Sequence, residues 1–243
     1  MKYLLPVALA SAMVALTACS SSDDDDGDGD GAAAPEAAAT SEPGSFQVTF
    51  TNMTAGQLMT PPVVAIHSPT VHLFQVGEIS SDAVRDIAET GANAELVAFA
   101  GANPDVVSAA GVAGDGPFAA GTSVTINLDT TEANQVLSAV NMLICTNDGI
   151  SGIDSVALPA DNNPVTFLAL PYDAGTRVNQ LDALTFFPPP CAEGDFDPAN
   201  EAVVEDPRIP IGPHAGQSGV ANASGNWDFG TDDQVLMVEV VRL

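Results

Sequence analysis

The chain of 243 residues carries 32 acidic residues against five Lys and Arg, which gives a formal charge of −27. A chain this acidic repels phosphate backbones, which argues against nucleic-acid binding, and it lacks the Lys and Arg clusters that bind lipid headgroups. Its hydrophobic content of 46% supplies enough apolar side chains for a core. The length allows one large domain or two small ones.

The N-terminus has the features of an export signal. Lys2 provides a positive charge, and the apolar stretch Leu4–Leu16 is too short to span a bilayer as a helix. It is followed by Thr17, Ala18 and Cys19, a sequence that resembles the lipobox of bacterial lipoproteins. We therefore expect residues 1–18 to be a lipoprotein signal peptide and Cys19 to carry lipid. An ordinary signal peptide with an accidental Cys is the alternative.

A low-complexity segment follows the predicted lipid anchor. Residues 20–44 contain a run of three Ser, a run of four Asp, interleaved Gly and an Ala-rich stretch with two Pro. Such a composition buries too little apolar surface to offset its chain entropy. We therefore expect 19–44 to be a lipidated, disordered acidic spacer and 45–243 to be one folded domain. Ser20 and Ser21 follow the Cys, and no Asp stands at that position, which matches the pattern for sorting to the outer membrane. We expect the domain to be either periplasmic or exposed at the cell surface.

Two further cysteines belong to the predicted domain. Cys145 and Cys191 form an even pair in an exported protein, so we predict a disulfide between them. A zinc site is disfavoured, because the two Cys and three scattered His show no ligand spacing.

The pattern beyond residue 44 is mainly that of β-strands. Alternating apolar residues predict half-buried strands, and the continuously apolar C-terminal run predicts a central strand. A short apolar run after two Pro predicts the start or edge of a strand. The predicted strands are 46–51, 63–66, 123–128, 136–145, 165–169 and 235–241. Their spacing, with Gly, Pro, Asn and Asp between them, is typical of a β-sandwich.

One helix is well signalled between the first strands. Ser80 or Ser81 can cap its start, Gly91 can end it, and an i,i+4 pair of Arg85 with Glu89 is expected on its surface. A second helix is weaker and covers 94–99.

Several segments, in order along the chain, resemble the spondin N-terminal domain. They are Phe46–Thr54, Thr60–His67, Leu73–Glu78, Met142–Gly149, Tyr172–Thr176 and Pro207–Gly216. The resemblance covers residues 46–243 and implies an antiparallel C2-like β-sandwich, here with one or two short helices. It also implies a role for the domain in surface interactions, because the animal members of the family belong to extracellular-matrix proteins.

The resemblance further implies two metal-binding loops, with Asp148 and Asp173 as calcium ligands. Ca²⁺ takes six to eight oxygen ligands, so loop carbonyls and water would complete the shell. The family has a further acidic ligand where this chain has Arg177. Three interpretations are open: the site still binds calcium, the guanidinium of Arg177 replaces the metal between the two Asp, or the two Asp only cap their loops.

No arrangement of nucleophile and base is evident. His67 and His72 would lie on opposite faces of a strand, His214 lies in a Pro/Gly loop, and Trp227 either anchors the final loop or stacks on a sugar. We therefore expect an envelope-anchored, non-catalytic binding or adhesion module whose partner is an extracellular or envelope protein or a glycan. The alternatives are an envelope hydrolase acting on glycans and a purely structural lipoprotein. The lipid anchor is the only expected membrane contact.

Overall fold

The structure is a computed structural model that describes residues 41–104, 107–177, 208–215, 230 and 232–243. The chain divides into two units, Met1–Ala37 and Ala38–Leu243, and the described residues all belong to the second. The predicted signal peptide, Cys19, Cys191 and Trp227 lie outside the described residues, as does the predicted spacer up to residue 40. None of the helices in the described ranges has the length and apolar character needed to cross a bilayer.

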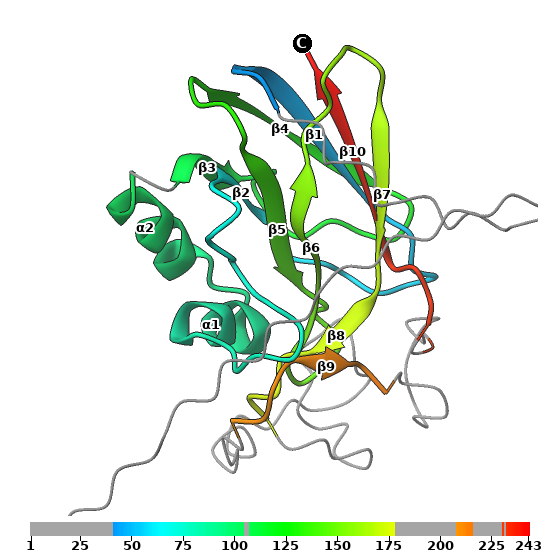
Figure 1. Ribbon diagram of the computed structural model, residues 1–243. Coiled ribbons are helices and arrows are strands. Elements are labelled where there is room, and N and C mark those ends of the chain that lie inside the picture. The colour runs from blue at the N-terminus through cyan, green and yellow to red at the C-terminus, as the bar shows by residue number, and fades with distance from the viewer. Residues whose placement is uncertain (1–40, 105–106, 178–207, 216–229, 231) are drawn as a thin grey trace, which may run out of the picture. The chain divides into compact units, whose positions relative to one another are not determined.

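The described unit is an antiparallel β-sandwich with two helices, as the sequence predicts (Figure 1). One sheet has the strand order β4-β1-β10-β7, and the other has the order β3-β2-β5-β6-β8-β9. The strands are β1 (Gly44–Asn52), β2 (Val63–His67), β3 (Val107–Val112), β4 (Ser123–Thr130), β5 (Val136–Met142), β6 (Gly149–Ala157), β7 (Val165–Ala169), β8 (Pro171–Asp173), β9 (Gly212–Pro213) and β10 (Leu236–Arg242).

The first core fills the space between the two sheets. Alternating side chains of β1 point into it, with Phe46, Val48 and Phe50 fully buried. They meet Val238 and Val240 of β10, which pairs with β1 on one side and with β7 on the other. The C-terminal strand is therefore central in its sheet, as its continuous apolar character predicts.

The second core lies on the outer face of the six-stranded sheet, beneath helices α1 (Asp82–Thr90) and α2 (Ala94–Ala102). Strand β2 serves both cores: Val64 and Ile66 face the sandwich interior, whereas Val63 and Ala65 face the helices. Because both of its faces are covered, every residue of β2 is buried. The strand begins directly after Pro62, as predicted.

Helix α1 has the ends that its sequence predicts. The hydroxyl of Ser81 accepts from the backbone N–H of Val84 (3.2 Å), and Gly91 ends the helix with φ +72°. The predicted surface pair of Arg85 with Glu89 is wrong, because Arg85 contacts Asp82 (3.3 Å) and Glu89 contacts an Arg from a distant loop.

The folded contacts begin slightly before residue 45. Ser41 is buried, and its hydroxyl donates to the carbonyl of Gln135 (2.9 Å). The guanidinium of Arg242, in the last strand, donates to the carbonyl of Glu42 (3.1 Å) and also to that of Pro43. Residues 41–43 are thus attached to the sandwich, and the rest of the predicted spacer precedes them.

Candidate metal-binding site

The sheet pairing brings Asp148 and Asp173 to the same end of the sandwich. Asp148 directly precedes β6, and Asp173 is the last residue of β8. These strands pair with Gly149 opposite Asp173. The backbone N–H of Ala174 donates to the carbonyl of Asp148 (3.2 Å), which joins the two loops. The two aspartates that the family resemblance pointed to therefore lie together.

The carboxylate of Asp148 is fully buried, and only one of its two oxygens is hydrogen-bonded. Its Oδ2 accepts from the backbone N–H groups of Thr176 and Arg177, both at 2.8 Å, and from the hydroxyl of Thr176 at 3.3 Å. Its Oδ1 is buried and has no hydrogen-bond partner. A buried carboxylate oxygen without a partner is costly, so Oδ1 is suited to a cation.

Asp173 is also almost fully buried and is oriented by its own loop. Its Oδ1 accepts from the backbone N–H of Gly175 at 2.7 Å, in a tight turn where Gly175 has φ +69°. A Cβ on Gly175 would lie 2.1 Å from the carbonyl oxygen of Ile209, so only glycine fits there.

The carboxyl group of Asp148 has a raised pKa. Its burial, and secondarily the neighbouring charge of Asp173, raise the pKa of Asp148 to about 6, against the opposing effect of the hydrogen bonds from Thr176 and Arg177. A bound divalent cation would oppose both causes, because its charge would neutralise the buried carboxylate and offset the repulsion between the two Asp.

These residues fit a weak calcium site. They provide hard oxygen ligands, an acceptor without a partner and two anionic groups, which suits Ca²⁺. Within the described ranges, however, no group of three or more His, Cys, Asp or Glu side chains gathers around a common point. Backbone carbonyls and water would have to supply the remaining ligands.

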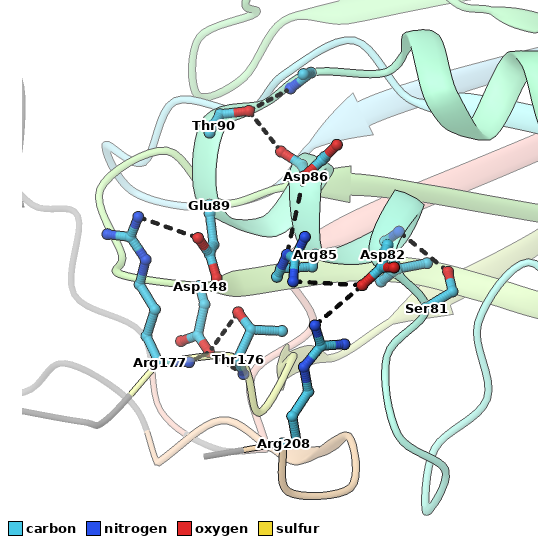
Figure 2. A network of polar contacts seen from close by, with 12 residues as sticks. Ser81, Asp82, Arg85, Asp86, Glu89, Thr90, Asp148, Thr176, Arg177 and Arg208 are labelled. Carbon is cyan, nitrogen blue, oxygen red and sulfur yellow. Dashed lines mark hydrogen bonds and ion pairs between the residues drawn. The ribbon is translucent and has the colours of Figure 1, made fainter. Parts of the chain in front are cut away.

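Arg177 does not replace the metal. Its guanidinium lies against Glu89 of α1, with Nη2 3.2 Å from Oε2, and both side chains are largely buried. Figure 2 shows the side chain extending toward Glu89 while the backbone end of the residue contacts Asp148. The interpretation in which this guanidinium takes the place of the metal between Asp148 and Asp173 is therefore wrong.

The contact with α1 is repeated by a second arginine. Arg208, which precedes β9, donates from Nη2 to Oδ1 of Asp82 at 3.0 Å (Figure 2). The helix thus receives one guanidinium at each end, from Arg177 in the loop after β8 and from Arg208 before β9. Sequence reasoning missed both pairs, since their partners are 88 and 126 residues apart.

A polar cluster on the six-stranded sheet was also missed. Nε2 of His67 lies 2.8 Å from the hydroxyl of Ser138, which in turn lies 3.2 Å from Oδ1 of Asp154, while Nδ1 of His72 contacts both oxygens of Asp154 at 2.9 Å. His72 lies beyond the end of β2, so the two His reach one cluster and not opposite faces. A β-bulge opposite Ser138 turns Asp154 and Ser155 toward it, with Ser155 at φ +55°.

His67 and Ser138 form the buried part of this cluster. Nδ1 of His67 donates to the carbonyl of Ser68 (2.9 Å), and the buried imidazole has a lowered pKa because burial disfavours its charged form. Ser138 and His67 are both fully buried, so no substrate can reach the hydroxyl. His214 is likewise buried, and its backbone N–H donates to the carbonyl of Pro171 (3.1 Å).

Cys145 is buried at the end of the β5–β6 turn, where its backbone N–H donates to Oε1 of Gln57 (2.6 Å). Its predicted partner, Cys191, lies outside the described residues, so the bridge between the two stays a prediction.

Comparisons with known proteins agree with the fold. No curated protein matches this chain. The model of the Spondin_N family matches residues 49–193, which run from the second half of β1 through β8 and include both helices and both aspartates. The match extends over more than half of the sequence, and the chain belongs to the Spondin_N family.

Proposed function

We propose that this protein is a non-catalytic binding or adhesion module that is held at the bacterial envelope by lipid on Cys19 and binds calcium weakly through Asp148 and Asp173. The observation that carries the calcium part is the buried Oδ1 of Asp148, which has no hydrogen-bond partner beside a second carboxylate. The adhesion part is supported by family membership and by the anchor and spacer that the sequence predicts.

The affinity for calcium is expected to be weak. Two carboxylates are fewer than tight calcium sites use, and Arg177 occupies the position of a third. Its guanidinium is directed to Glu89, so it adds positive charge near the loops without blocking Oδ1 of Asp148. A dissociation constant in the millimolar class, which extracellular modules use, fits this ligand set.

A thermal melt tests the calcium site. The purified chain is heated with calcium, with magnesium at equal ionic strength, and with chelator. A ligand that binds only the folded state stabilises it by about 2.7 kcal/mol at a hundredfold excess over Kd. We expect a calcium-specific rise in Tm that disappears in Asp148→Asn and in Asp173→Asn.

The matched control is Asp129→Asn, which removes one exposed carboxylate from β4 and leaves the loops intact. It should keep the calcium response. A response of the same size with magnesium, or one that survives Asp148→Asn, would show that calcium acts on the acidic surface and not at this site.

Fractionation tests the anchor. Lipid on Cys19 would place the protein in the membrane fraction, with an outer-membrane address, because several acyl chains hold a protein almost permanently. Cys19→Ala should release it into the soluble fraction. An unchanged membrane fraction would contradict lipidation. Protease treatment of intact cells would then tell a surface-exposed domain from a periplasmic one.

A further inference from the structure

The free edge of β7 is unlike the other sheet edges in the described part of the chain. β7 pairs with β10 on one side, and no strand of the described residues pairs with its other side (Figure 1). Its sequence, VTFLA, contains no charged residue, and Val165 and Leu168 are 37% and 45% exposed. Native edge strands usually carry charges, Pro or a covering element, because bare backbone groups invite another strand.

The remaining edges show such protection. Strand β4, at the opposite edge of the same sheet, presents Ser, Thr, Asn and Asp side chains outward. In the other sheet, β3 is contacted by α2, and β9 is only two residues long. Among the described edges, β7 is thus the one that combines exposed apolar side chains with an unprotected backbone.

A groove of about 630 Å³ lies beside this edge, between β7 and the outer edge of β6. Strand β8 pairs with β6 only as far as Ser151, so the following residues of β6 have no strand partner on that side in the described structure. The groove walls include Val76 (47% exposed), Val156 and Leu168, and the Phe74–Tyr172 ring pair has centroids 6.0 Å apart. Its volume is in the range of ligand-binding clefts.

We propose that β7 and this groove bind an extended peptide that adds a strand to the sheet and carries both apolar and basic side chains. Strand addition lets the backbone of the partner pair with a free edge while alternate side chains enter the neighbouring groove. The inference rests on the proposed role as a binding module and names its class of partner.

Charge determines which peptide fits. Residues 45–243 contain 24 acidic residues against four Arg, and among the described residues that line the groove Asp154 is the only acidic or basic one. Lys and Arg on the partner are therefore attracted, and acidic peptides are repelled. A second copy of this chain is disfavoured as the occupant, because both copies would carry the same excess of acidic residues. A glycan is the alternative occupant, and the displacement test below distinguishes it from the peptide.

The probe is a fluorescent seven-residue peptide of alternating Val and Lys, blocked at both ends and titrated into the purified chain by anisotropy. We expect saturable binding. The same peptide with Glu in place of Lys, and a version N-methylated at alternate residues so that its backbone cannot pair, should each bind at least tenfold more weakly.

Variants of the protein locate the site. Leu168→Ser should weaken binding about tenfold, whereas Met53→Ser, which removes an equally exposed side chain (45%) outside the groove, should leave it unchanged. The inference is overturned if the Val/Lys peptide does not bind, if N-methylation or Leu168→Ser has no effect, or if a neutral oligosaccharide displaces the peptide. The calcium-dependent rise in Tm is measured on the same samples, which separates the test of this inference from the test of the calcium site. If calcium raises Tm but the peptide does not bind, the inference fails and the proposed calcium site stands.

Discussion

Arg177 and Asp148 are joined through the backbone of the arginine and not through its charge. The N–H of Arg177 donates to Oδ2 of Asp148 at 2.8 Å, and the guanidinium lies on Glu89. The arginine thus has two separate roles: its backbone orients the candidate calcium ligand, and its side chain ties the loop after β8 to α1. Substituting the side chain should change the second role without removing the first.

The ion pair of Arg177 with Glu89 should contribute measurably to stability. The two side chains are 15% and 19% exposed, so removing one partner leaves a largely buried charge. We expect Arg177→Gln and Glu89→Gln each to cost about 1 to 3 kcal/mol in urea unfolding. The double variant should cost less than the sum, with a coupling energy of about 1 kcal/mol. Additive single effects would show that the pair contributes nothing beyond packing.

Gly175 should be essential for the conformation of the loop after β8, which orients Asp173. An Ala there would adopt φ +69° and place its Cβ 2.1 Å from the carbonyl oxygen of Ile209, so the backbone must move. We expect Gly175→Ala to destabilise by about 3 kcal/mol and to abolish the calcium response, since the N–H that orients Asp173 is displaced.

The control for this change is Gly121→Ala. Gly121 also has positive φ (+73°), but nothing lies within 4 Å of an added Cβ. It should cost only about 1 kcal/mol, the conformational penalty of a left-handed Ala, and keep calcium binding. Equal losses in the two variants would mean that the contact with Ile209 is unimportant.

Local patterns predicted most of the fold. Alternation along β1 and β4, continuous apolarity in β10, and the Ser81 and Gly91 ends of α1 each follow from short-range physics that one sequence displays. β6 was missed because Gly149, Gly152 and a bulge at Ser155 interrupt the alternation of apolar and polar residues along it. β3 was missed because its small Ser, Ala and Gly side chains give little contrast between its two faces.

The candidate site was predictable only in part. The family resemblance pointed to Asp148 and Asp173, and their loops meet because β6 pairs with β8. The position of the Arg177 guanidinium could not be predicted, because its partner lies 88 residues earlier on a helix whose packing depends on the second core. The same holds for His72 and Asp154, which are 82 residues apart and meet through a bulge.

The disulfide between Cys145 and Cys191 remains a prediction, and its expected contribution to stability can be estimated. Closing a loop of about 46 residues should stabilise the fold by roughly 4 kcal/mol in the chain-entropy model. Reduction, or the double change Cys145→Ser and Cys191→Ser, should lower the free energy of unfolding by about this amount. Intact mass of alkylated, unreduced protein is the direct test, and two alkylated thiols in the folded, unreduced chain would contradict the bridge.

The stability of the calcium-free protein should depend on the ionisation of Asp148. The pKa of this carboxyl is raised from 3.8 to about 6 by folding, so between these values the folded state binds more protons than the unfolded state. The neutral carboxyl therefore favours folding fully below about pH 4, and this contribution is lost as the pH rises through 6. A shift of about two units corresponds to roughly 3 kcal/mol.

Asp148→Asn isolates this contribution from the repulsion among the many other acidic groups. Urea unfolding in chelator at pH 4.5 and at pH 7 should show a larger loss of stability in the unaltered protein than in Asp148→Asn, whereas Asp129→Asn should behave like the unaltered protein. Added calcium should reduce the difference at pH 7, because the cation neutralises the ionised carboxylate at the pH where its burial costs most. Equal pH dependence in the unaltered chain and in Asp148→Asn would show that the buried carboxylate of Asp148 is not a source of strain, and would remove the electrostatic argument for a cation between the two loops.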